Sequence, residues 1–431
     1  MRTTLLAALL LLACAFTARA ETAWPAYIGT LPRAVSESPV AAELPAEVAK
    51  LAPDASLPPE LARWSGAWNG WACFAALCDI KLAIRDLTAT GARVTYAGAS
   101  AQQVNNDEAA GTFDGGELQV RLRTGAKVVL RLRADGDMEF SLWRPDTQLL
   151  SAGVLSRKPP AYVRQAEWIT TPWTEQGKPV RLELVVHRPP GAGPFRTVII
   201  NHGSTGEGNR PEWFKQTWTS PELSAFLVAR GWQVMYPQRR GRGRSDGLYD
   251  EGFERDRSRY SCDPELSLPG AEHALADLEV AYAAIKARPD VDARQLVVGG
   301  ISRGGILSVA FAGRHPQELR GVLNFVGGWV GGGCPQASLV NTTLFNAGVG
   351  FPRDTLWLYG EKDPFYRIAH SRSNFDAFRA AGGKASFHVL PPPDGLDGHN
   401  IYRQPALWAS EVDAYFTAIG SGPRPPAGSA P

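Results

Sequence analysis

From residue 159 onward the chain alternates between short apolar runs and amphipathic stretches, and this alternation constrains the fold more than any other feature. The expected strands lie at residues 181–186, 197–200, 232–236, 295–298, 322–326, 355–359 and 386–390, and the expected helices at 221–230, 271–288, 302–314, 371–381 and 405–419. Such alternation predicts a doubly wound, mostly parallel sheet. We therefore expect an α/β domain over residues 159–420.

The preceding region has a different pattern and predicts a small all-β domain over residues 63–158. Its apolar runs lie at residues 80–84, 93–96, 118–122, 128–132, 138–142 and 149–155. Turn residues such as Asp114-Gly115-Gly116 separate them, as in a meander barrel or sandwich. The opening Gly66-Ala67-Trp68-Asn69-Gly70-Trp71 resembles the start of small lipocalin-like barrels. Two roles remain open: a structural or spacing module, or a ligand-binding barrel.

The N-terminus has the features of an export signal. Met1-Arg2 precedes an apolar run at residues 5–13, and Ala18-Arg19-Ala20 offers a cleavage site, so residues 1–20 are expected to be a signal peptide. Cys14 also fits a lipoprotein site, which makes a lipid anchor the alternative to a freely soluble protein. Residues 21–62 are expected to be a linker and 421–431 a disordered tail. A periplasmic or secreted location follows, with no transmembrane helix in the mature chain.

Charge and cysteine content limit the classes of partner. The formal charge of +2, from 45 basic and 43 acidic side chains, argues against a nucleic-acid partner. Without Cys14 four of the five cysteines remain, which permits three pairings in an oxidising compartment. The domain organisation favours Cys73 with Cys78 and Cys262 with Cys334. No metal site is expected, because no histidine lies near Cys73 or Cys78 in the sequence.

One motif carries chemistry: Gly300-Ile301-Ser302-Arg303-Gly304 stands between an expected strand and an expected helix. This is G-x-S-x-G in the strand-turn-helix context that makes it a nucleophile site. The turn is so sharp that a Cβ at either flanking position would collide with the backbone. It lifts the Ser302 hydroxyl to a helix N-terminus, where free N–H groups favour an oxyanion. The alternative is a glycine-rich turn that Ser302 merely caps.

A serine nucleophile needs a base, and the base needs an orienting acid. In this arrangement both follow the serine in chain order, on loops after later strands. Asp363 follows the strand at 355–359 and is preferred over Glu361, which lies closer to the strand end. His399, in a glycine-rich loop after the last strand, is the one histidine of the seven with the required order and loop position.

An oxyanion hole requires two N–H donors. One is expected from the backbone of Arg303, directly after the nucleophile. The other is expected from the loop His202-Gly203-Ser204, with Ser204 as the preferred donor and His202 as a structural partner of the loop. The arginine-rich loop at residues 239–247 is interpreted as structural support, with a substrate-facing arginine as the alternative.

Residues 166–420 resemble α/β-hydrolases of the dienelactone-hydrolase and prolyl-oligopeptidase branch. The resemblance rests on the His-Gly loop, an R-G-x-G-x-S loop, G-x-S-x-G-G, G-x-x-D after a strand and a late Gly-His. It implies a serine hydrolase without a cofactor, acting on a small-molecule ester or a short peptide. Ester cleavage is the preferred expectation; an aminopeptidase or acyl-peptidase, and a non-catalytic protein that binds ligands through its barrel, are the alternatives. Dienelactone hydrolases carry cysteine where this chain has Ser302, so that substrate is not implied.

Overall fold

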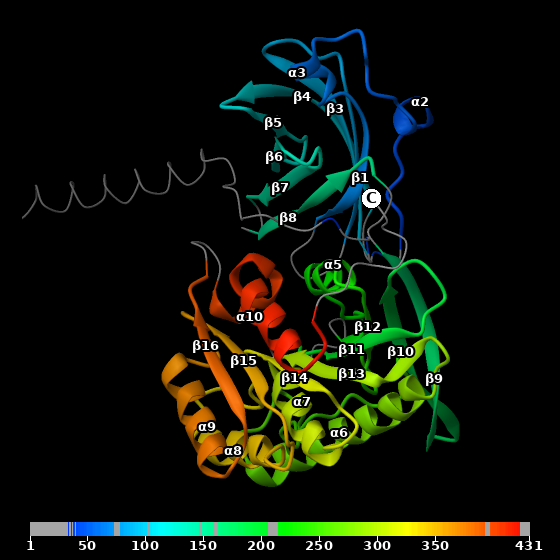
Figure 1. The fold of residues 1–431 in the computed structure, drawn as a ribbon. Coiled ribbons are helices and arrows are strands. Elements are labelled where there is room, and N and C mark those ends of the chain that lie inside the picture. Colours follow the sequence, from blue (N-terminus) through cyan, green and yellow to red (C-terminus); the bar gives the residue numbers. More distant parts are fainter. Residues whose placement is uncertain are drawn as a thin grey trace, which may run out of the picture. The chain divides into compact units, whose positions relative to one another are not determined.

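The computed structural model describes residues 33, 36, 38, 40–72, 78–100, 104–145, 149–158, 162–205, 214–392 and 397–422. The chain divides into two compact units, Met1–Pro160 and Ala161–Pro431. Figure 1 labels their helices and strands.

The first unit contains a closed barrel of eight strands. In chain order they are β1 (Gly66–Ala72), β2 (Asp79–Arg85), β3 (Gly91–Ala99), β4 (Val104–Asp114), β5 (Glu117–Arg121), β6 (Lys127–Leu132), β7 (Met138–Arg144) and β8 (Leu149–Ser156). Consecutive strands pair antiparallel, and β1 closes the barrel on β8. The expected small β domain is confirmed. The sequence pattern had missed β1 and β4; β4 is polar and mostly exposed, so it lacks an alternating apolar signal.

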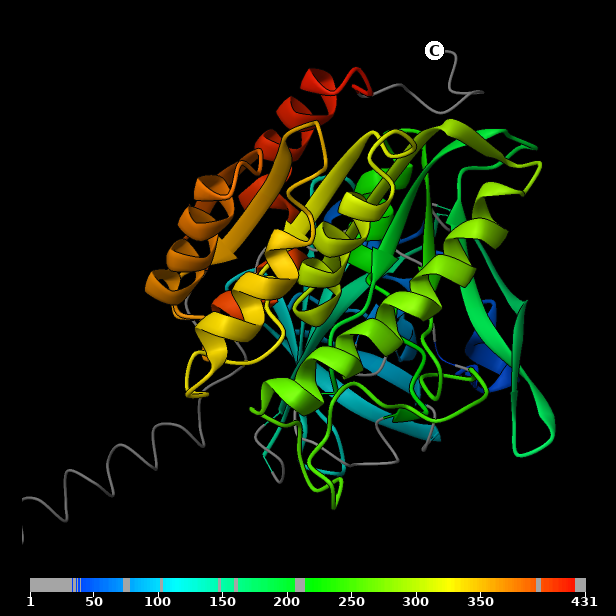
Figure 2. The same cartoon turned by 90° about the horizontal axis from the view of Figure 1, so that it is seen from below.

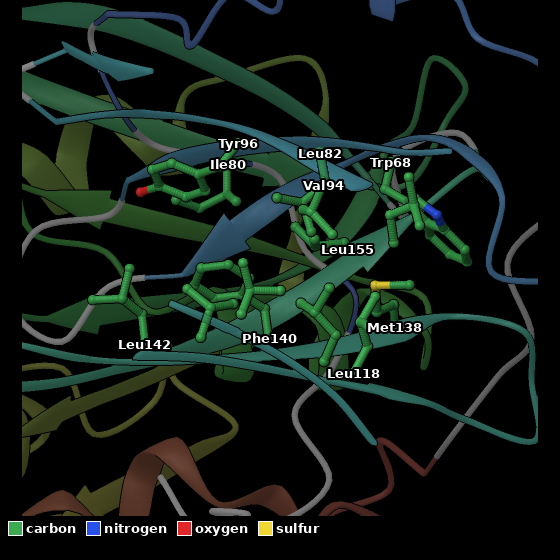
Figure 3. Close-up of a cluster of buried hydrophobic side chains, with 14 of the residues drawn as sticks. Trp68, Ile80, Leu82, Val94, Tyr96, Leu118, Met138, Phe140, Leu142 and Leu155 are labelled. Atoms are coloured by element: carbon green, nitrogen blue, oxygen red, sulfur yellow. The ribbon is translucent and has the colours of Figure 1, made fainter. Parts of the chain in front are cut away.

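The barrel is filled by its own side chains. Trp68, Leu82, Leu118, Met138 and Phe140 are each 0–1% exposed, and Figure 3 shows them converging on one interior. Of these, Phe140 also lines a small pocket of about 30 Å³ with Tyr96 and Leu142, room for about one water molecule. A more open pocket of about 440 Å³ shares Tyr96 and Leu142 with it. An eight-stranded barrel is just wide enough for side chains to fill it. This packing favours the structural role over a ligand-binding interior.

Part of the expected linker packs on the barrel. It contains two short helices, α2 (Ala46–Ala49) and α3 (Pro59–Ala62). Ala42, Leu44 and Val48 are buried in a cluster with residues of β2 and β3, and the Ala42 amide donates to the Asp79 carboxylate at 2.8 Å. This stretch is therefore ordered against the barrel wall.

The second unit is built on a mixed sheet of eight strands. They are β9 (Val163–Glu175), β10 (Lys178–Arg188), β11 (Phe195–Asn201), β12 (Trp232–Pro237), β13 (Val291–Ile301), β14 (Gly321–Phe325), β15 (Thr355–Gly360) and β16 (Ala385–Leu390). The spatial order is β16-β15-β14-β13-β11-β12-β10-β9. Neighbours from β12 to β16 pair parallel, whereas β10 pairs antiparallel with both β9 and β12. The expected doubly wound, mostly parallel sheet is confirmed.

Helices cover both faces of this sheet. They are α5 (Pro221–Val228), α6 (Pro264–Lys286), α7 (Arg303–Arg314), α8 (Ala337–Asn346), α9 (Ile368–Ala380) and α10 (Pro405–Ala418), with the 3₁₀ helix η1 (Gly398–Arg403). Figure 1 shows α5 and α10 on one face and α6 to α9 on the other. In Figure 2, which looks onto the second face, those four helices lie in front of the strands. The sheet is therefore buried on both sides, as its apolar parallel strands require.

Three elements differ from the sequence expectation. Helix α6 begins at Pro264 instead of residue 271, because Asp263 caps it and Pro269 is accommodated inside. Strand β9 was not among the expected strands; it has many polar, exposed residues, which are typical of a sheet edge. Helix α8 lies where the sequence indicated a loop. The parallel strands end together at one edge of the sheet, where the candidate residues gather.

Candidate active site

Ser302 occupies a strained turn between β13 and α7. Its backbone has φ 57° and ψ −123°, a conformation that costs a non-glycine residue free energy and is typical of functional sites. A Cβ at Gly304 would lie 2.0 Å from the carbonyl oxygen of Asn201, and one at Gly300 would lie 2.3 Å from Gly304 backbone atoms. Only glycine fits at either position, so the G-x-S-x-G spacing is a steric requirement of this turn.

Asp363 and His399 form a hydrogen-bonded pair on the loops after β15 and β16. The ring nitrogen Nδ1 of His399 lies 2.9 Å from Oδ2 of Asp363, whose side chain is fully buried. The other carboxylate oxygen accepts the backbone N–H groups of Phe365 and Tyr366 at 2.8 and 3.0 Å. A carboxylate at Nδ1 selects the tautomer whose Nε2 is free to accept a proton. Glu361, the competing carboxylate, is exposed.

The His399 loop is fixed from its own start. Asp397 caps η1, and its carboxylate accepts the backbone N–H groups of His399 and Asn400 at 2.9 and 3.2 Å. The imidazole packs edge-on against Phe365, with ring centroids 4.8 Å apart. Backbone capping and ring packing together hold the imidazole in place.

Tyr366, which the sequence analysis did not single out, contacts all three candidate residues. Its amide donates to Asp363, and its ring centroid lies 5.7 Å from that of His399. Its phenol donates to the Gly328 carbonyl at 2.8 Å, and the Ser302 side chain is close enough to the phenol to lower its pKa slightly. Burial raises the pKa of the phenol to about 12, so it stays protonated. The only sequence signal was its place three residues after Asp363.

The loop after β11 lies against the nucleophile. A Cβ on Gly203 would lie 3.1 Å from Cβ of Ser302, so this backbone approaches as closely as glycine allows. Ser204 follows Gly203 in the loop. The next amide, of Thr205, already donates to the Tyr260 phenol at 3.1 Å. Across the turn, Arg303 is the first residue of α7, where a backbone N–H has no acceptor within the helix.

His202 supports that loop. Its Nε2 accepts the Arg239 amide at 3.2 Å, and its Nδ1 lies 2.8 Å from the Gly203 carbonyl oxygen. Burial, together with the charges of Arg239 and Arg242, holds its pKa well below the ordinary value, so the ring is neutral. These contacts agree with the interpretation of His202 as a structural partner.

The Arg303 side chain belongs to a buried ionic network. Its Nη1 donates to the Glu251 carbonyl at 2.6 Å and lies 3.5 Å from the Glu251 carboxylate, which also pairs with Arg239 at 2.5 Å. Burial alone would raise the pKa of Glu251, but the two guanidinium groups bring it below its ordinary value. The guanidinium of Arg303 also lies over the rings of Tyr260 and Trp329, 3.8 and 4.2 Å from their centroids.

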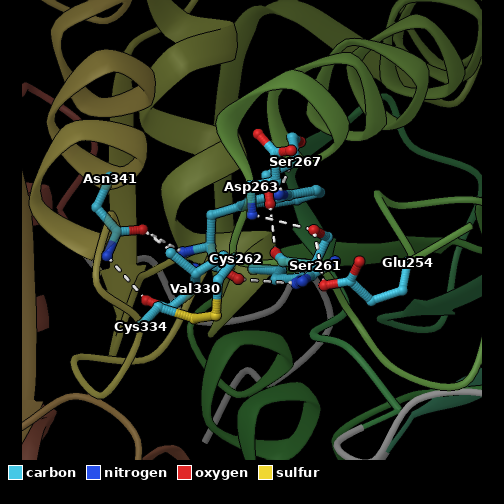
Figure 4. The surroundings of a disulfide bond; sticks show 10 residues. Glu254, Ser261, Cys262, Asp263, Ser267, Val330, Cys334 and Asn341 are labelled. Atoms are coloured by element: carbon cyan, nitrogen blue, oxygen red, sulfur yellow. Dashed lines mark hydrogen bonds between the residues drawn. A yellow bond between two sulfur atoms is a disulfide. The ribbon is translucent and has the colours of Figure 1, made fainter.

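A disulfide joins two loops beside this network. Cys262 and Cys334 are bonded, with Cα atoms 5.5 Å apart, as the sequence analysis expected. Figure 4 shows Asn341 of α8 near the bridge. The side-chain oxygen of Asn341 accepts a hydrogen bond from the Trp329 amide at 2.8 Å, and its side-chain nitrogen donates to the Val330 carbonyl at 2.9 Å. The carbonyl of Trp329 in turn accepts from Arg303. The bridge therefore fixes a loop that positions Arg303, the residue after Ser302.

The remaining expectations concern the other cysteines and the N-terminal signal. Cys78 is disulfide-bonded, whereas its expected partner Cys73, the signal peptide and Cys14 lie outside the described residues.

Within the described ranges, no helix is long and apolar enough to cross a membrane.

The second unit thus combines a doubly wound, mostly parallel sheet with a serine turn after β13 and a histidine loop after β16. No family model matches the chain, and no curated protein matches it. Among solved structures, a protein from Klebsiella pneumoniae described as a dienelactone hydrolase is 21% identical with a TM-score of 0.38, over 59% of this chain and 99% of that one. An esterase from Pyrococcus furiosus is 16% identical with a TM-score of 0.40, over 60% and 91%. A Bacteroides ovatus protein described as a dipeptidyl aminopeptidase IV is 12% identical with a TM-score of 0.43, over 80% of this chain and 48% of that one.

Proposed function

We propose that the chain is a serine hydrolase that cleaves carboxylic esters through Ser302, His399 and Asp363. The observation that carries this proposal is the 2.9 Å contact between His399 and a fully buried Asp363. Tyr366, which packs on His399, connects this pair through Gly328 to the strained Ser302 turn. A buried carboxylate that orients an imidazole beside a strained serine has the parts of a nucleophile and its base.

The reaction proceeds in two halves. The Ser302 hydroxyl passes its proton to Nε2 of His399 while Oγ bonds to the ester carbonyl carbon. The carbonyl oxygen becomes an oxyanion, which the backbone N–H groups of Arg303 and Ser204 stabilise. The tetrahedral intermediate then expels the alcohol, which takes the proton from His399, and leaves an acyl-enzyme.

Water completes the cycle. His399 removes a proton from water as its oxygen attacks the acyl carbon, and the bond to Ser302 breaks as the proton returns to the serine. Each oxyanion donor is expected to contribute about 10²–10³-fold to the rate. Asp363 stays ionised throughout and stabilises the imidazolium.

We also propose that the protein acts outside the cytoplasm, in the periplasm or after secretion. The support is the Cys262–Cys334 disulfide, since such bonds persist mainly in oxidising compartments.

Amide cleavage by the same residues is the alternative within this mechanism, and ligand binding by the barrel is the alternative without catalysis. The apolar side chains that fill the barrel interior count against a ligand bound inside it. Substrate preference separates all three: esters, aminoacyl amides, or neither.

The test is a fluorophosphonate label mapped to its residue, with turnover of nitrophenyl esters and aminoacyl amides measured beside it. We expect the label on Ser302 and loss of ester turnover in Ser302→Ala, with Ser410→Ala, an exposed serine of α10, as the unaffected control. Turnover that survives Ser302→Ala would refute the nucleophile. A preference for amides would favour the peptidase alternative.

A further inference from the structure

Three of the four arginines in the loop at residues 239–247 pair with a buried carboxylate. The pairs and their distances are Arg239–Glu251 at 2.5 Å, Arg240–Asp277 at 2.6 Å and Arg244–Glu183 at 2.7 Å. Arg242 has no carboxylate partner among the described residues. Glu251 differs from the other two carboxylates, because it also contacts an arginine outside this loop.

Glu251 joins two arginines that follow different strands. Its side chain is almost completely buried. Its Oε1 lies 2.5 Å from Nε of Arg239, which follows β12, and its Oε2 lies 3.5 Å from Nη1 of Arg303, which follows β13. The same Nη1 donates to the backbone carbonyl of Glu251 at 2.6 Å. Each carboxylate oxygen thus faces a different arginine, and each arginine leads to one side of the expected oxyanion hole.

Arg239 extends the contact to the loop after β11. Its Nη1 donates to the His202 carbonyl at 2.9 Å, and its Nη2 donates to the Gly203 carbonyl at 3.4 Å. Its backbone N–H donates to Nε2 of His202 at 3.2 Å. Because that nitrogen is an acceptor, the ring proton of His202 is on Nδ1, which donates to the Gly203 carbonyl at 2.8 Å. The Gly203 carbonyl is therefore held by two donors.

The direction of the Gly203 carbonyl decides where the next amide points. A carbonyl and the N–H that follows it belong to one planar peptide group, and in the trans form they point in opposite directions. The amide that follows Gly203 is that of Ser204, the expected oxyanion donor. The Arg239 guanidinium and the His202 ring, which hold this carbonyl, therefore set the direction of the Ser204 N–H.

Arg303 extends the contact to the other expected donor, which is its own backbone N–H. Its Nε donates to the Trp329 carbonyl at 2.9 Å. Its guanidinium lies over the rings of Tyr260 and Trp329, 3.8 and 4.2 Å from their centroids. Together with Glu251, these contacts fix the Arg303 side chain at several points. A side chain held in this way restrains the backbone that carries it, at the first residue of α7.

We propose that Glu251 is a positioning residue that fixes both donors of the oxyanion hole, acting on the Ser204 amide through Arg239 and on the Arg303 amide through the Arg303 side chain. This role rests on the proposed ester hydrolysis. A buried ion pair is often no more stabilising than apolar side chains of the same volume, so stability alone does not explain the arrangement. Donors that are fixed beforehand need no reorganisation when the oxyanion forms.

The kinetic test is Glu251→Gln, which removes the charge and keeps the shape of the side chain. We expect kcat for 4-nitrophenyl acetate to fall by about 30-fold or more and KM to stay within about 3-fold, because the hole binds the tetrahedral intermediate more tightly than the ester. The matched control is Glu183→Gln, which removes another buried carboxylate from its arginine, Arg244. The control should keep kcat within about 3-fold of wild type.

A binding measurement separates positioning from a general loss of structure. 1,1,1-Trifluoroheptan-2-one forms an oxyanion when Oγ of Ser302 bonds to its carbonyl carbon and the serine proton passes to His399, whereas heptan-2-one binds without this step. In Glu251→Gln the inhibition constant of the fluorinated ketone should rise by about the factor by which kcat/KM falls, and that of heptan-2-one should change by less than about 3-fold.

A second variant keeps the test decisive if Glu251→Gln does not fold. Arg239→Lys keeps a positive charge beside Glu251 but lacks the planar fork that reaches the His202 and Gly203 carbonyls. We expect kcat to fall by about 10-fold, with KM within about 3-fold. A folded Arg239→Lys with wild-type kcat would overturn the proposal.

The other outcomes are distinct. Wild-type kcat in folded Glu251→Gln, equal losses in Glu251→Gln and Glu183→Gln, or an equal rise in the inhibition constants of both ketones would show that Glu251 is structural and overturn the proposal. The rate at which a fluorophosphonate labels Ser302 tests Glu251 without an ester, because the phosphonyl oxygen uses the same hole as Oγ displaces fluoride. Labelling that slows in Glu251→Gln while no ester is turned over would refute the proposed function alone. Absence of both labelling and turnover in the wild type would overturn both.

Discussion

Both units bury an apolar core, and the second unit also buries a network of paired ionic groups. The barrel interior is apolar, with Trp68, Leu118 and Phe140 each at most 1% exposed. The second unit buries Arg239, Glu251 and other charged or polar groups near the edge where its parallel strands end. Burying charge is costly and burying hydrocarbon is favourable. The barrel is therefore organised for stability, whereas the second unit gives up stability to hold polar groups in position for chemistry.

The largest expected effect concerns the buried polar groups of the second unit. Asp363→Asn should lower kcat by about 10³–10⁴-fold, because an amide does not select the His399 tautomer and does not stabilise the imidazolium. Steady-state kinetics with a nitrophenyl ester measure the loss. The control is Glu361→Gln, which removes an exposed carboxylate two residues away. Comparable losses in both variants would contradict the assignment of the acid.

The next largest effect concerns the apolar interior of the barrel. Phe140→Ala should lower the free energy of unfolding of the barrel by about 4 kcal/mol, because the barrel cannot collapse around the lost ring. Urea unfolding measures the change. Turnover at low temperature should stay within about 2-fold of wild type. A full loss of turnover with a stable barrel would show that the apolar unit takes part in the chemistry.

The Cys262–Cys334 disulfide stabilises the second unit by a covalent bond. The Cys262→Ser and Cys334→Ser double variant should lose about 3 kcal/mol of stability, because a loop spanning a sequence separation of 72 residues is released in the unfolded chain. Thermal unfolding with and without reductant measures it. Because reductant also breaks the disulfide of Cys78, wild type and double variant should unfold alike when both are reduced; a remaining difference would mean that the substitutions themselves disturb the fold.

A smaller effect is expected at Tyr366. Tyr366→Phe removes the phenol that donates to Gly328, whose amide in turn donates to the Ser302 carbonyl, so kcat should fall by about 10-fold with little change in KM. The melting temperature should fall only slightly, because one hydrogen bond is worth about 1 kcal/mol. A rise in kcat would mean that Tyr366 restrains the serine instead of aligning it.

The smallest effect is a pH dependence in the barrel. Burial raises the pKa of Glu139 to about 7, against the opposing charges of Arg133 and Arg131. The folded state thus binds a proton more tightly than the unfolded state, whose carboxyl has an ordinary pKa near 4.5. Stability from this group falls as the pH rises from about 4.5 to 7. Hydrogen exchange of barrel amides at pH 5 and 8 should show this trend, and Glu139→Gln should weaken it.

Local patterns were enough to predict much of the fold and the main candidate residues. The serine turn, the late histidine loop and most parallel strands depend on short-range spacing, which the sequence displays. The edge strand β9 and the polar strand β4 have weak patterns because water covers much of each. Helix α8 follows a glycine-rich loop that obscured its start.

The missed site residues have a different cause. Tyr366 matters because loops after β13, β14 and β15 meet at its phenol, and chain spacing does not report such a meeting. Glu251 matters because each of its carboxylate oxygens faces an arginine from a different part of the chain, and this is a property of the folded loops. The sequence could indicate an arginine-rich supporting loop, but not which of its arginines would lack a carboxylate partner among the described residues.

Closure of the barrel has a consequence for biosynthesis. A ring of strands that closes β1 on β8 exposes no unpaired backbone edge, and such edges are the usual start of aggregation. The barrel strands all precede β9 in the chain, so a nascent polypeptide can complete the barrel before the first strand of the mixed sheet is made. The parallel strands of the second unit are distant in sequence and assemble more slowly. They then do so while the barrel, which has no unpaired strand edge, is already folded in the same chain.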